Sequence, residues 1–152
     1  MTPPEAWLFD INVLIAIIDP AHVFHESIHR WLQIHVGETW ATCPLTENGF
    51  VRILAQPAYR SGPFTAVEAI DALARMKAVP DRKHVFWSDT ISICDGSVVR
   101  ANRIAGPKQI TDVYLAALAL RNKGRVVTFD VGVAWQAVAG AEANLITIPD
   151  QV

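Results

Sequence analysis

The sequence has few cysteines, no long hydrophobic run and almost no net charge. Its two cysteines, Cys43 and Cys94, form no Cys-x-x-Cys pair, so we expect reduced thiols rather than a zinc site or a disulfide. The longest apolar run near the start, residues 13–18, is too short to span a membrane. Residues 1–5 lack the basic region and apolar core of a signal peptide. We therefore expect a soluble, cytoplasmic protein that does not bind membranes.

The charge and composition limit the possible classes of protein further. The formal net charge is −2, so nucleic-acid binding would need a local basic patch or metal ions rather than bulk attraction. Hydrophobic residues make up 51% of the chain, which excludes disorder. The 152 residues are enough for one domain with a core, and they contain no repeat, linker or low-complexity segment. The sequence therefore predicts a single domain over residues 1–152.

Short apolar runs alternate with segments of helical periodicity along the chain. Strands are predicted at residues 7–9, 39–42, 84–87, 126–129 and 145–148. Helices are predicted at residues 12–18, 22–36, 44–56, 64–78, 96–104, 112–122 and 133–138. Strands that are apolar almost throughout are typical of a parallel sheet with both faces covered. The pattern therefore predicts an α/β fold.

Four acids follow predicted strands or open predicted helices. Asp10 and Asp130 come directly after apolar strands. Glu47 and Asp112 lie in the first turns of helices, the second of which we expect Thr111 to cap. Because strand ends and helix starts meet at one edge of a parallel sheet, the four carboxylates can converge there. Converging carboxylates repel one another unless cations are bound, and oxygen ligands suit Mg²⁺ or Mn²⁺. The pattern therefore indicates metal-assisted hydrolysis of a phosphodiester.

Each of these acids also has an ordinary structural explanation. Asp112 and Glu47 would complement the positive end of a helix dipole. Asp10 would cap the helix that follows it, and Asp130 would belong to a turn. The hypothesis of a metal site therefore depends on all four acids together.

The four acids lie in four ordered segments that match a known family. The segments are LFDINVLI at 8–15, PLTENGFVR at 44–52, QITDVYLAALA at 109–119 and TFDVGV at 128–133. In this order they resemble the PIN-domain ribonucleases, and within them the VapC-like toxins of bacterial toxin-antitoxin pairs. The resemblance covers essentially the whole chain. It departs at Ile11, where many relatives carry Thr, and at Pro107, where relatives often have His.

The resemblance implies a fold, an activity and partners. The implied fold is a three-layer α/β/α sandwich with a mostly parallel five-stranded sheet. The implied activity is Mg²⁺- or Mn²⁺-dependent cleavage of RNA, often a structured tRNA or ribosomal RNA loop. The implied partners are a cognate antitoxin and a second copy of the chain in a homodimer.

The resemblance also implies roles for individual residues. Asp10 and Asp112 match the family's usual metal ligands. The acids that complete the catalytic metal site match Glu47 and Asp130. Asn12 and Thr128 match positions that support the site by hydrogen bonding, although Asn12 could be a helix cap and Thr128 an ordinary strand residue.

Histidines and basic residues form a second group of candidates. His22, His25 and His29 invite a metal hypothesis, but no acid or cysteine at zinc-motif spacing accompanies them, and their neighbours form an ordinary amphipathic helix. Four basic residues are candidates for RNA phosphate contacts or, alternatively, are solvated surface charges. These are Arg52, Arg60, Lys108 and Arg121.

Two other functions remain open. A phosphatase of the haloacid-dehalogenase type would use Asp10 as nucleophile, but it needs a second Asp where this chain has Asn12. A PIN-like module that binds RNA or protein without catalysis is the other alternative, and the presence of all four acids argues against it.

Overall fold

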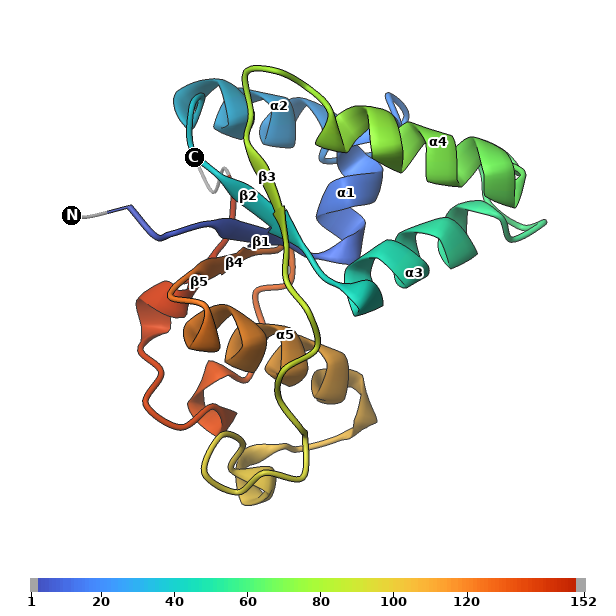
Figure 1. The fold of residues 1–152 in the computed structure, drawn as a ribbon. Helices are drawn as coiled ribbons and strands as arrows, with labels where there is room; N and C mark the ends of the chain where they lie inside the picture. The colour runs from blue at the N-terminus through green and yellow to red at the C-terminus, as the bar shows by residue number, and fades with distance from the viewer. Residues whose placement is uncertain (1–2, 150–152) are drawn as a thin grey trace.

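Five parallel strands form one sheet at the centre of the molecule (Figure 1). The computed structural model describes residues 3–149. The strands are β1 (Trp7–Phe9), β2 (Trp40–Thr42), β3 (His84–Phe86), β4 (Arg125–Val127) and β5 (Ile146–Thr147). Their order across the sheet is β3-β2-β1-β4-β5, and every neighbouring pair is parallel. The predicted α/β class and parallel five-stranded sheet are confirmed.

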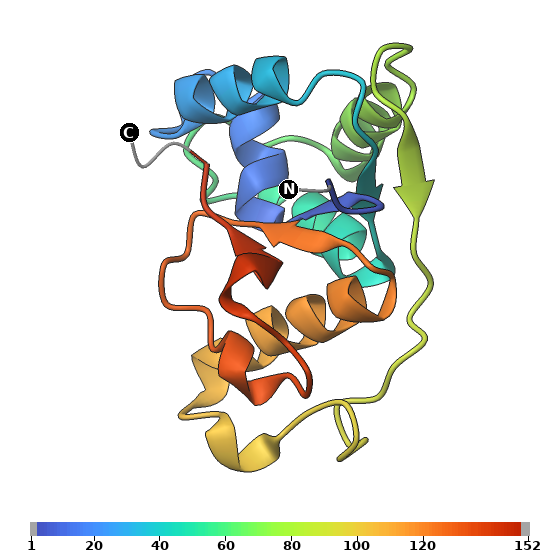
Figure 2. The same cartoon turned by 90° about the vertical axis from the view of Figure 1, so that its left-hand side faces the viewer.

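Helices cover both faces of this sheet and complete three layers (Figures 1 and 2). One face carries α1 (Ile11–Ile18), α2 (His25–Ile34), α3 (Pro44–Leu54) and α4 (Ala66–Lys77). The other face carries α5 (Ile110–Arg121). Short 3₁₀ turns accompany α5 at Ala101–Arg103, Pro107–Gln109, Trp135–Ala137 and Ala143–Leu145.

Successive residues of the strands supply two separate cores. Trp7 and Phe9 of β1 pack with the helices α1 to α4, whereas Leu8 between them packs with α5. In β2, Trp40 packs in the core of α1 to α4, and Ala41 packs in the core of α5. Because side chains alternate across a strand, a strand buried on both faces must be apolar at every position. This explains why the strands were recognisable as continuous apolar runs.

The connections between strands reverse direction beside β1. From β1 the chain continues to β2 and β3 on one side, and it then returns to β4 and β5 on the other. Such a reversal opens a crevice at the carboxyl ends of the strands, where ligands bind in open α/β sheets. Asp10 directly follows β1, and its N–H donates to the carbonyl of Val127 at 3.0 Å. Asp10 therefore lies at the reversal point, beside the end of β4.

The helices predicted over residues 96–104 and 133–138 are wrong. Each segment contains only a 3₁₀ turn, at Ala101–Arg103 and at Trp135–Ala137. The two segments instead pair with each other through an antiparallel bridge between Val99 and Val138. This pairing uses backbone N–H and C=O groups that would otherwise form the internal hydrogen bonds of a helix. Because the two segments are far apart in the sequence, the local periodicity of side chains could not reveal that they pair.

Helix α5 begins earlier than predicted. Its first residue is Ile110, and Gln109 occupies the N-cap position without a side-chain hydrogen bond. Thr111 therefore lies inside the first turn, and its predicted role as the cap is wrong. The turn Pro107–Gln109 runs directly into the helix, so the backbone is already curled where a capping residue would stand. Asp112 still lies in the first turn, as predicted.

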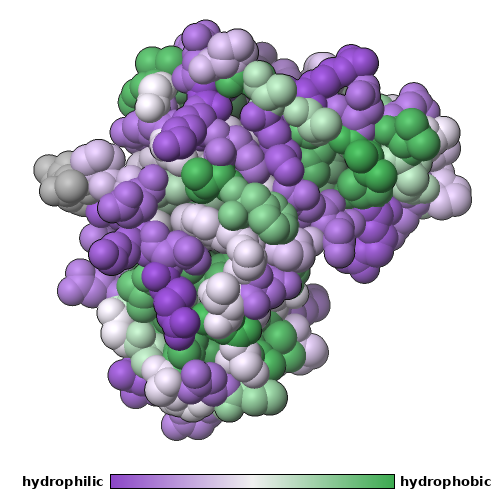
Figure 3. Space-filling model, viewed as in Figure 1, coloured by the Kyte–Doolittle hydropathy of each residue, from purple (hydrophilic) through white to green (hydrophobic). Residues whose placement is uncertain are grey.

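Apolar side chains gather on the surface over α4 (Figure 3). Val67 and Ile70 in this helix are 76% and 55% exposed. Across residues 3–149, no helix is both long and apolar enough to cross a membrane.

Helices α1 and α3 come very close at Gly49. A Cβ atom at position 49 would stand 2.3 Å from Cδ1 of Ile11, so the present position of the Ile11 side chain requires glycine there. Ile11 directly follows Asp10, and Gly49 lies two residues after Glu47. The contact therefore sets the separation between two helix starts that carry candidate acids.

Candidate active site

Asp10 lies between β1 and α1 and is only 9% exposed. Its Oδ1 accepts the N–H of Ile11 at 2.7 Å and so caps α1, while its Oδ2 accepts the hydroxyl of Thr128 at 2.9 Å. The pKa of Asp10 is raised above its ordinary value, mainly because the carboxyl group is buried. The hydrogen bonds from Thr128 and Ile11 lower this pKa, and the charge of Asp130 raises it further. The Asp10 side chain therefore caps α1 and also belongs to the candidate site.

Thr128 connects two of the candidate acids. It is 1% exposed, and besides donating to Asp10 its Oγ1 accepts the N–H of Asp130 at 3.1 Å. The predicted supporting hydrogen bond is therefore confirmed. Asn12 is exposed in the first turn of α1, where Asp10 holds the cap position. The alternative that Asn12 caps the helix is wrong, and its supporting role stays a prediction.

Asp112 and Asp130 complete a group of three aspartates with Asp10. Asp112 lies in the first turn of α5, and when it is protonated its carboxyl group shares a hydrogen bond with that of Asp130. Burial, this hydrogen bond, and the charges of Asp10 and Asp130 raise the pKa of Asp112 to about 7. Asp130 also accepts the N–H of Gly132 at 2.8 Å through Oδ1. The ends of β1 and β4 and the start of α5 thus bring three predicted acids together.

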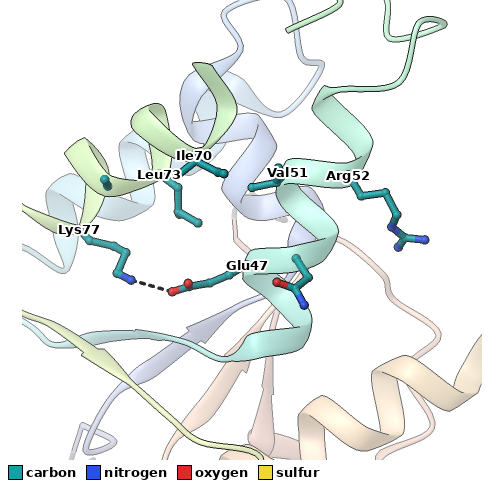
Figure 4. A pocket seen from close by; sticks show the side chains of 8 residues that line it. Glu47, Val51, Arg52, Ile70, Leu73 and Lys77 are labelled. Carbon is teal, nitrogen blue, oxygen red and sulfur yellow. Dashed lines mark hydrogen bonds and ion pairs between the residues drawn. The ribbon is translucent and has the colours of Figure 1, made fainter. Parts of the chain in front are cut away.

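Glu47 has different partners. Its Oε2 accepts the hydroxyl of Thr42 at 2.5 Å and the ammonium of Lys77 at 2.8 Å. Figure 4 shows Glu47 of α3 and Lys77 of α4 pointing toward each other at one end of the cavity between these helices, while Arg52, which also lines the cavity, points away from Lys77. Within residues 3–149, no hydrogen bond or ion pair joins Glu47 to the three aspartates. Glu47, the fourth predicted acid, is thus paired with the side chain of Lys77.

The Glu47 pair extends into a buried polar chain. Thr42 is fully buried and, besides donating to Glu47, lies 2.8 Å from Nε2 of His84. Burial and the charge of Lys77 lower the pKa of His84 to about 4, so the imidazole is neutral at pH 7. Neither Lys77 nor His84 was a candidate from the sequence. Lys77 joins α4 to Glu47 of α3, and His84 joins β3 to Thr42 of β2, and no local motif marks such pairs.

The donor set at the three aspartates fits a hard divalent cation. All of its ligating atoms are carboxylate oxygens, which Mg²⁺ and Mn²⁺ prefer. A cation there would also offset the mutual repulsion that helps to raise the pKa of Asp112. In the part of the chain that the structure describes, no three Asp, Glu, His or Cys side chains already form a metal-holding cluster. The assignment of metal ligands therefore stays a prediction.

The histidines of α2 have structural partners. Nδ1 of His25 lies 2.6 Å from the carbonyl of Ala16, and Nε2 of His29 lies 2.8 Å from that of Ile17. Both carbonyls belong to the last turn of α1, which lacks internal partners for them. These rings therefore hold α2 against α1. His22 has a different neighbour, because its ring centroid lies 6.1 Å from that of Phe129, the residue that directly precedes Asp130.

The four basic candidates occupy different positions. Arg52, Arg60 and Lys108 are exposed, and Lys108 lies in the turn just before α5. Arg121 is at the opposite end of α5 from Asp112. Contact with RNA stays a prediction for all four.

A profile of the PIN domain matches residues 8–140, the span that contains all four candidate acids. The chain belongs to the PIN-domain family. The family resemblance predicted from the ordered segments is therefore confirmed.

The relatives of this PIN domain agree with that assignment. Ribonuclease VapC44 of Mycobacterium tuberculosis is 48% identical over 134 residues, which cover 88% of this chain and 92% of the relative. Ribonuclease VapC39 of the same organism is 39% identical over 133 residues, covering 88% and 94%. The crystal structure of VapC20 from Mycobacterium tuberculosis, described as a Sarcin-Ricin loop cleaving toxin, superposes on 90% of this chain and 98% of the VapC20 chain with a TM-score of 0.56. At 10% identity, this last likeness shows the fold alone.

Proposed function

We propose that this PIN domain is an endoribonuclease that hydrolyses RNA phosphodiester bonds with Mg²⁺ or Mn²⁺, as the toxin of a toxin-antitoxin pair. The convergence of Asp10, Asp112 and Asp130 at the reversal point of the sheet carries the proposal. The relation to VapC ribonucleases supports the same activity.

Asp10 and Asp112 would hold the metal, and Asp130 and Glu47 would complete its environment. A bound divalent cation supplies activation of water and stabilisation of the negative charge that develops during phosphodiester hydrolysis. Glu47 would take part only by exchanging its contact with Lys77, because that ammonium now lies 2.8 Å from its carboxylate.

The surrounding residues prepare the site before a substrate arrives. Thr128 fixes one oxygen of Asp10, and the first turn of α1 fixes the other. At a pH below about 7, Asp112 keeps a proton in its hydrogen bond with Asp130. The N-termini of α1 and α5 both open at these aspartates, and the positive ends of their dipoles favour an anionic phosphate nearby.

The decisive experiment offers the purified chain two substrates in parallel, a mixture of tRNA and ribosomal RNA and a small phosphomonoester. We expect RNA cleavage with Mg²⁺ or Mn²⁺, no cleavage in EDTA, and no phosphate release from the monoester. Phosphate release without RNA cleavage would instead establish the phosphatase. Tight RNA or protein binding without turnover in Mn²⁺ would establish a binding module.

The biological setting follows from the same proposal. The chain would act as one nuclease domain in the cytoplasm, away from membranes, as a homodimer that a cognate antitoxin inhibits. We expect that expression without the antitoxin arrests growth and that co-expression of a small protein encoded next to it restores growth. Sequencing of RNA ends after brief induction would identify the target, which we predict to be a structured tRNA or ribosomal RNA.

A further inference from the structure

A cavity lies at the opposite end of α1 from Asp10. Its volume is about 670 Å³, and its walls come from the turn after α1 and the loop after α3. The turn contributes His22, and the loop contributes Gln56, Tyr59 and Arg60. No residue of this cavity takes part in the site described above.

A buried carboxylate holds the two walls of the cavity together. Asp19, which is 7% exposed, accepts the hydroxyl of Tyr59 at 2.5 Å and the N–H of Ala21 at 2.9 Å. The hydrogen bond from Tyr59 is the main cause that lowers the pKa of Asp19, so this carboxylate is ionised at neutral pH. The cavity is therefore preformed, and a negative charge lies in its wall.

Aromatic rings connect this cavity to the aspartates. Phe24 stacks on Phe129 with ring centroids 4.3 Å apart, and the ring of His22 lies 6.0 Å from Phe24 and 6.1 Å from Phe129. Phe129 stands directly between Thr128 and Asp130 in the sequence. Phe24 is 39% exposed, so part of its ring is open to a ligand. The aromatic cluster of His22, Phe24 and Phe129 thus begins beside the aspartates and ends at the cavity wall.

The distance from the aspartates suits a neighbouring nucleotide of one RNA strand. The eight residues of α1 separate Asp10 from the cavity. At 1.5 Å rise per residue this helix is roughly 12 Å long. A strand whose phosphate lies at the aspartates can therefore bring a flanking base to the cavity.

We propose that this cavity and the aromatic cluster form a subsite for one unpaired nucleobase of the RNA substrate, next to the bond that is cut. Aromatic faces hold unpaired bases by stacking, and the amide of Gln56 and the guanidinium of Arg60 offer hydrogen bonds to a base edge. The ionised Asp19 in the wall opposes a phosphate at the same place. Paired bases cannot enter such a subsite, so it selects single-stranded loops. The inference rests on the proposed nuclease function.

The hydrogen bonds of His22 agree with this assignment. Its Nδ1 accepts the N–H of Phe24 at 3.1 Å, so the neutral ring carries its proton on Nε2. Burial lowers the pKa of His22, which keeps the ring neutral at pH 7. A neutral ring with one N–H can stack on a base and donate a hydrogen bond to it.

The test measures RNA binding without cleavage. Fluorescence anisotropy in EDTA compares a short labelled single-stranded RNA of random sequence with an RNA duplex of the same length. Loss of one base–aromatic contact costs about 1–3 kcal/mol, so Phe24→Ala and His22→Ala should weaken single-strand binding roughly five- to 140-fold. Duplex binding should not change. His22→Phe, which keeps an aromatic face, should retain most of the affinity.

The matched control is Phe86→Ala, because Phe86 is also an exposed aromatic residue, at 51%, but lies on β3 away from the cavity. Equal binding by Phe24→Ala, His22→Ala and this control would overturn the subsite, as would equal losses on single strand and duplex. A parallel cleavage assay in Mn²⁺ separates the two proposals. If the wild-type protein cuts RNA and the Phe24 and His22 variants bind and cut RNA like the control, only the subsite is disproved. If the wild-type protein does not cut RNA, the nuclease proposal itself is disproved.

Discussion

The two acidic regions of this PIN domain differ in how their charge is balanced. Asp10, Asp112 and Asp130 lie among one another, and burial and neighbouring carboxyl groups raise the pKa of Asp112 to about 7. Glu47 instead lies against the ammonium of Lys77. An added cation would offset the repulsion within the first region, whereas Glu47 in the second region already has the ammonium of Lys77 as its counter-ion. Under the proposed function, the metal would therefore be centred on the aspartates, and Glu47 would join only by changing partner.

The largest effect is expected from removing a charge of the aspartate group. Asp10→Asn keeps a side-chain oxygen for the cap of α1 but loses the anionic ligand. Changing outer-shell partners of a metal typically costs 10–100-fold, so loss of a direct ligand should lower RNA cleavage in Mn²⁺ by more than about 100-fold. The matched control is Asp71→Asn, which removes an exposed aspartate paired with Arg75 on α4. Wild-type activity of Asp10→Asn would contradict the metal role.

A smaller effect is expected from Thr128, which orients Asp10 without binding the metal itself. Thr128→Val keeps the shape but removes the 2.9 Å hydrogen bond to Asp10. We expect a loss of cleavage of roughly 10–100-fold with weaker Mn²⁺ binding, whereas Thr128→Ser, which keeps the hydroxyl, should recover most of both. Steady-state kinetics at several Mn²⁺ concentrations check this. Equal behaviour of the Val and Ser variants would show that the hydroxyl is not required.

The third prediction concerns pH. Because the folded pKa of Asp112 is about 7, above its ordinary value, the folded metal-free protein keeps a proton that the unfolded chain has already lost. Stability in EDTA should therefore decrease as pH rises from about 4 to 7 and then level off. Mn²⁺, which binds the ionised carboxylates, should raise the melting temperature more in alkaline than in acidic buffer. Thermal scans of wild type and Asp112→Asn test this, and a wild-type slope unchanged in the variant would exclude Asp112 as its cause.

The smallest effect is expected from breaking the ion pair between Lys77 and Glu47. The side chains of Lys77 and Glu47 are 30% and 22% exposed, so Lys77→Met should cost about 1 kcal/mol of unfolding free energy, near the upper end for ion pairs with some solvent access. The side chains of Arg75 and Asp71 are 81% and 54% exposed, so Arg75→Met should change stability by less than about 0.5 kcal/mol.

Lys77→Met also tests the change of partner by Glu47. If the ammonium competes with the metal for Glu47, the variant should bind Mn²⁺ more tightly than wild type, and Arg75→Met should not. Urea unfolding and Mn²⁺ titration measure the two effects. Unchanged or weaker Mn²⁺ binding by Lys77→Met would show that Lys77 does not hold Glu47 back.

Sequence patterns predicted the features that depend on local periodicity. β1 and β4 were recognisable because both their faces are buried, and Asp10 directly follows β1 as predicted, whereas Asp130 lies three residues beyond the end of β4 rather than directly after it. The helix over residues 96–104 was wrong because Val99 forms an isolated antiparallel bridge with Val138, far along the chain. The ion pair of Glu47 was missed because it depends on how α4 packs against α3. Local signals therefore located the acids but could not show which of them had a counter-ion.

The close approach of α1 and α3 has a consequence for how the sequence can vary. Gly49 leaves the volume that Ile11 occupies, so the two positions share one fixed amount of space. A larger side chain at position 49 fits only with a smaller one at position 11. Because residue 11 directly follows Asp10 and residue 49 lies near Glu47, an unmatched change would move these acids apart. Related chains should therefore show correlated side-chain sizes at positions 11 and 49.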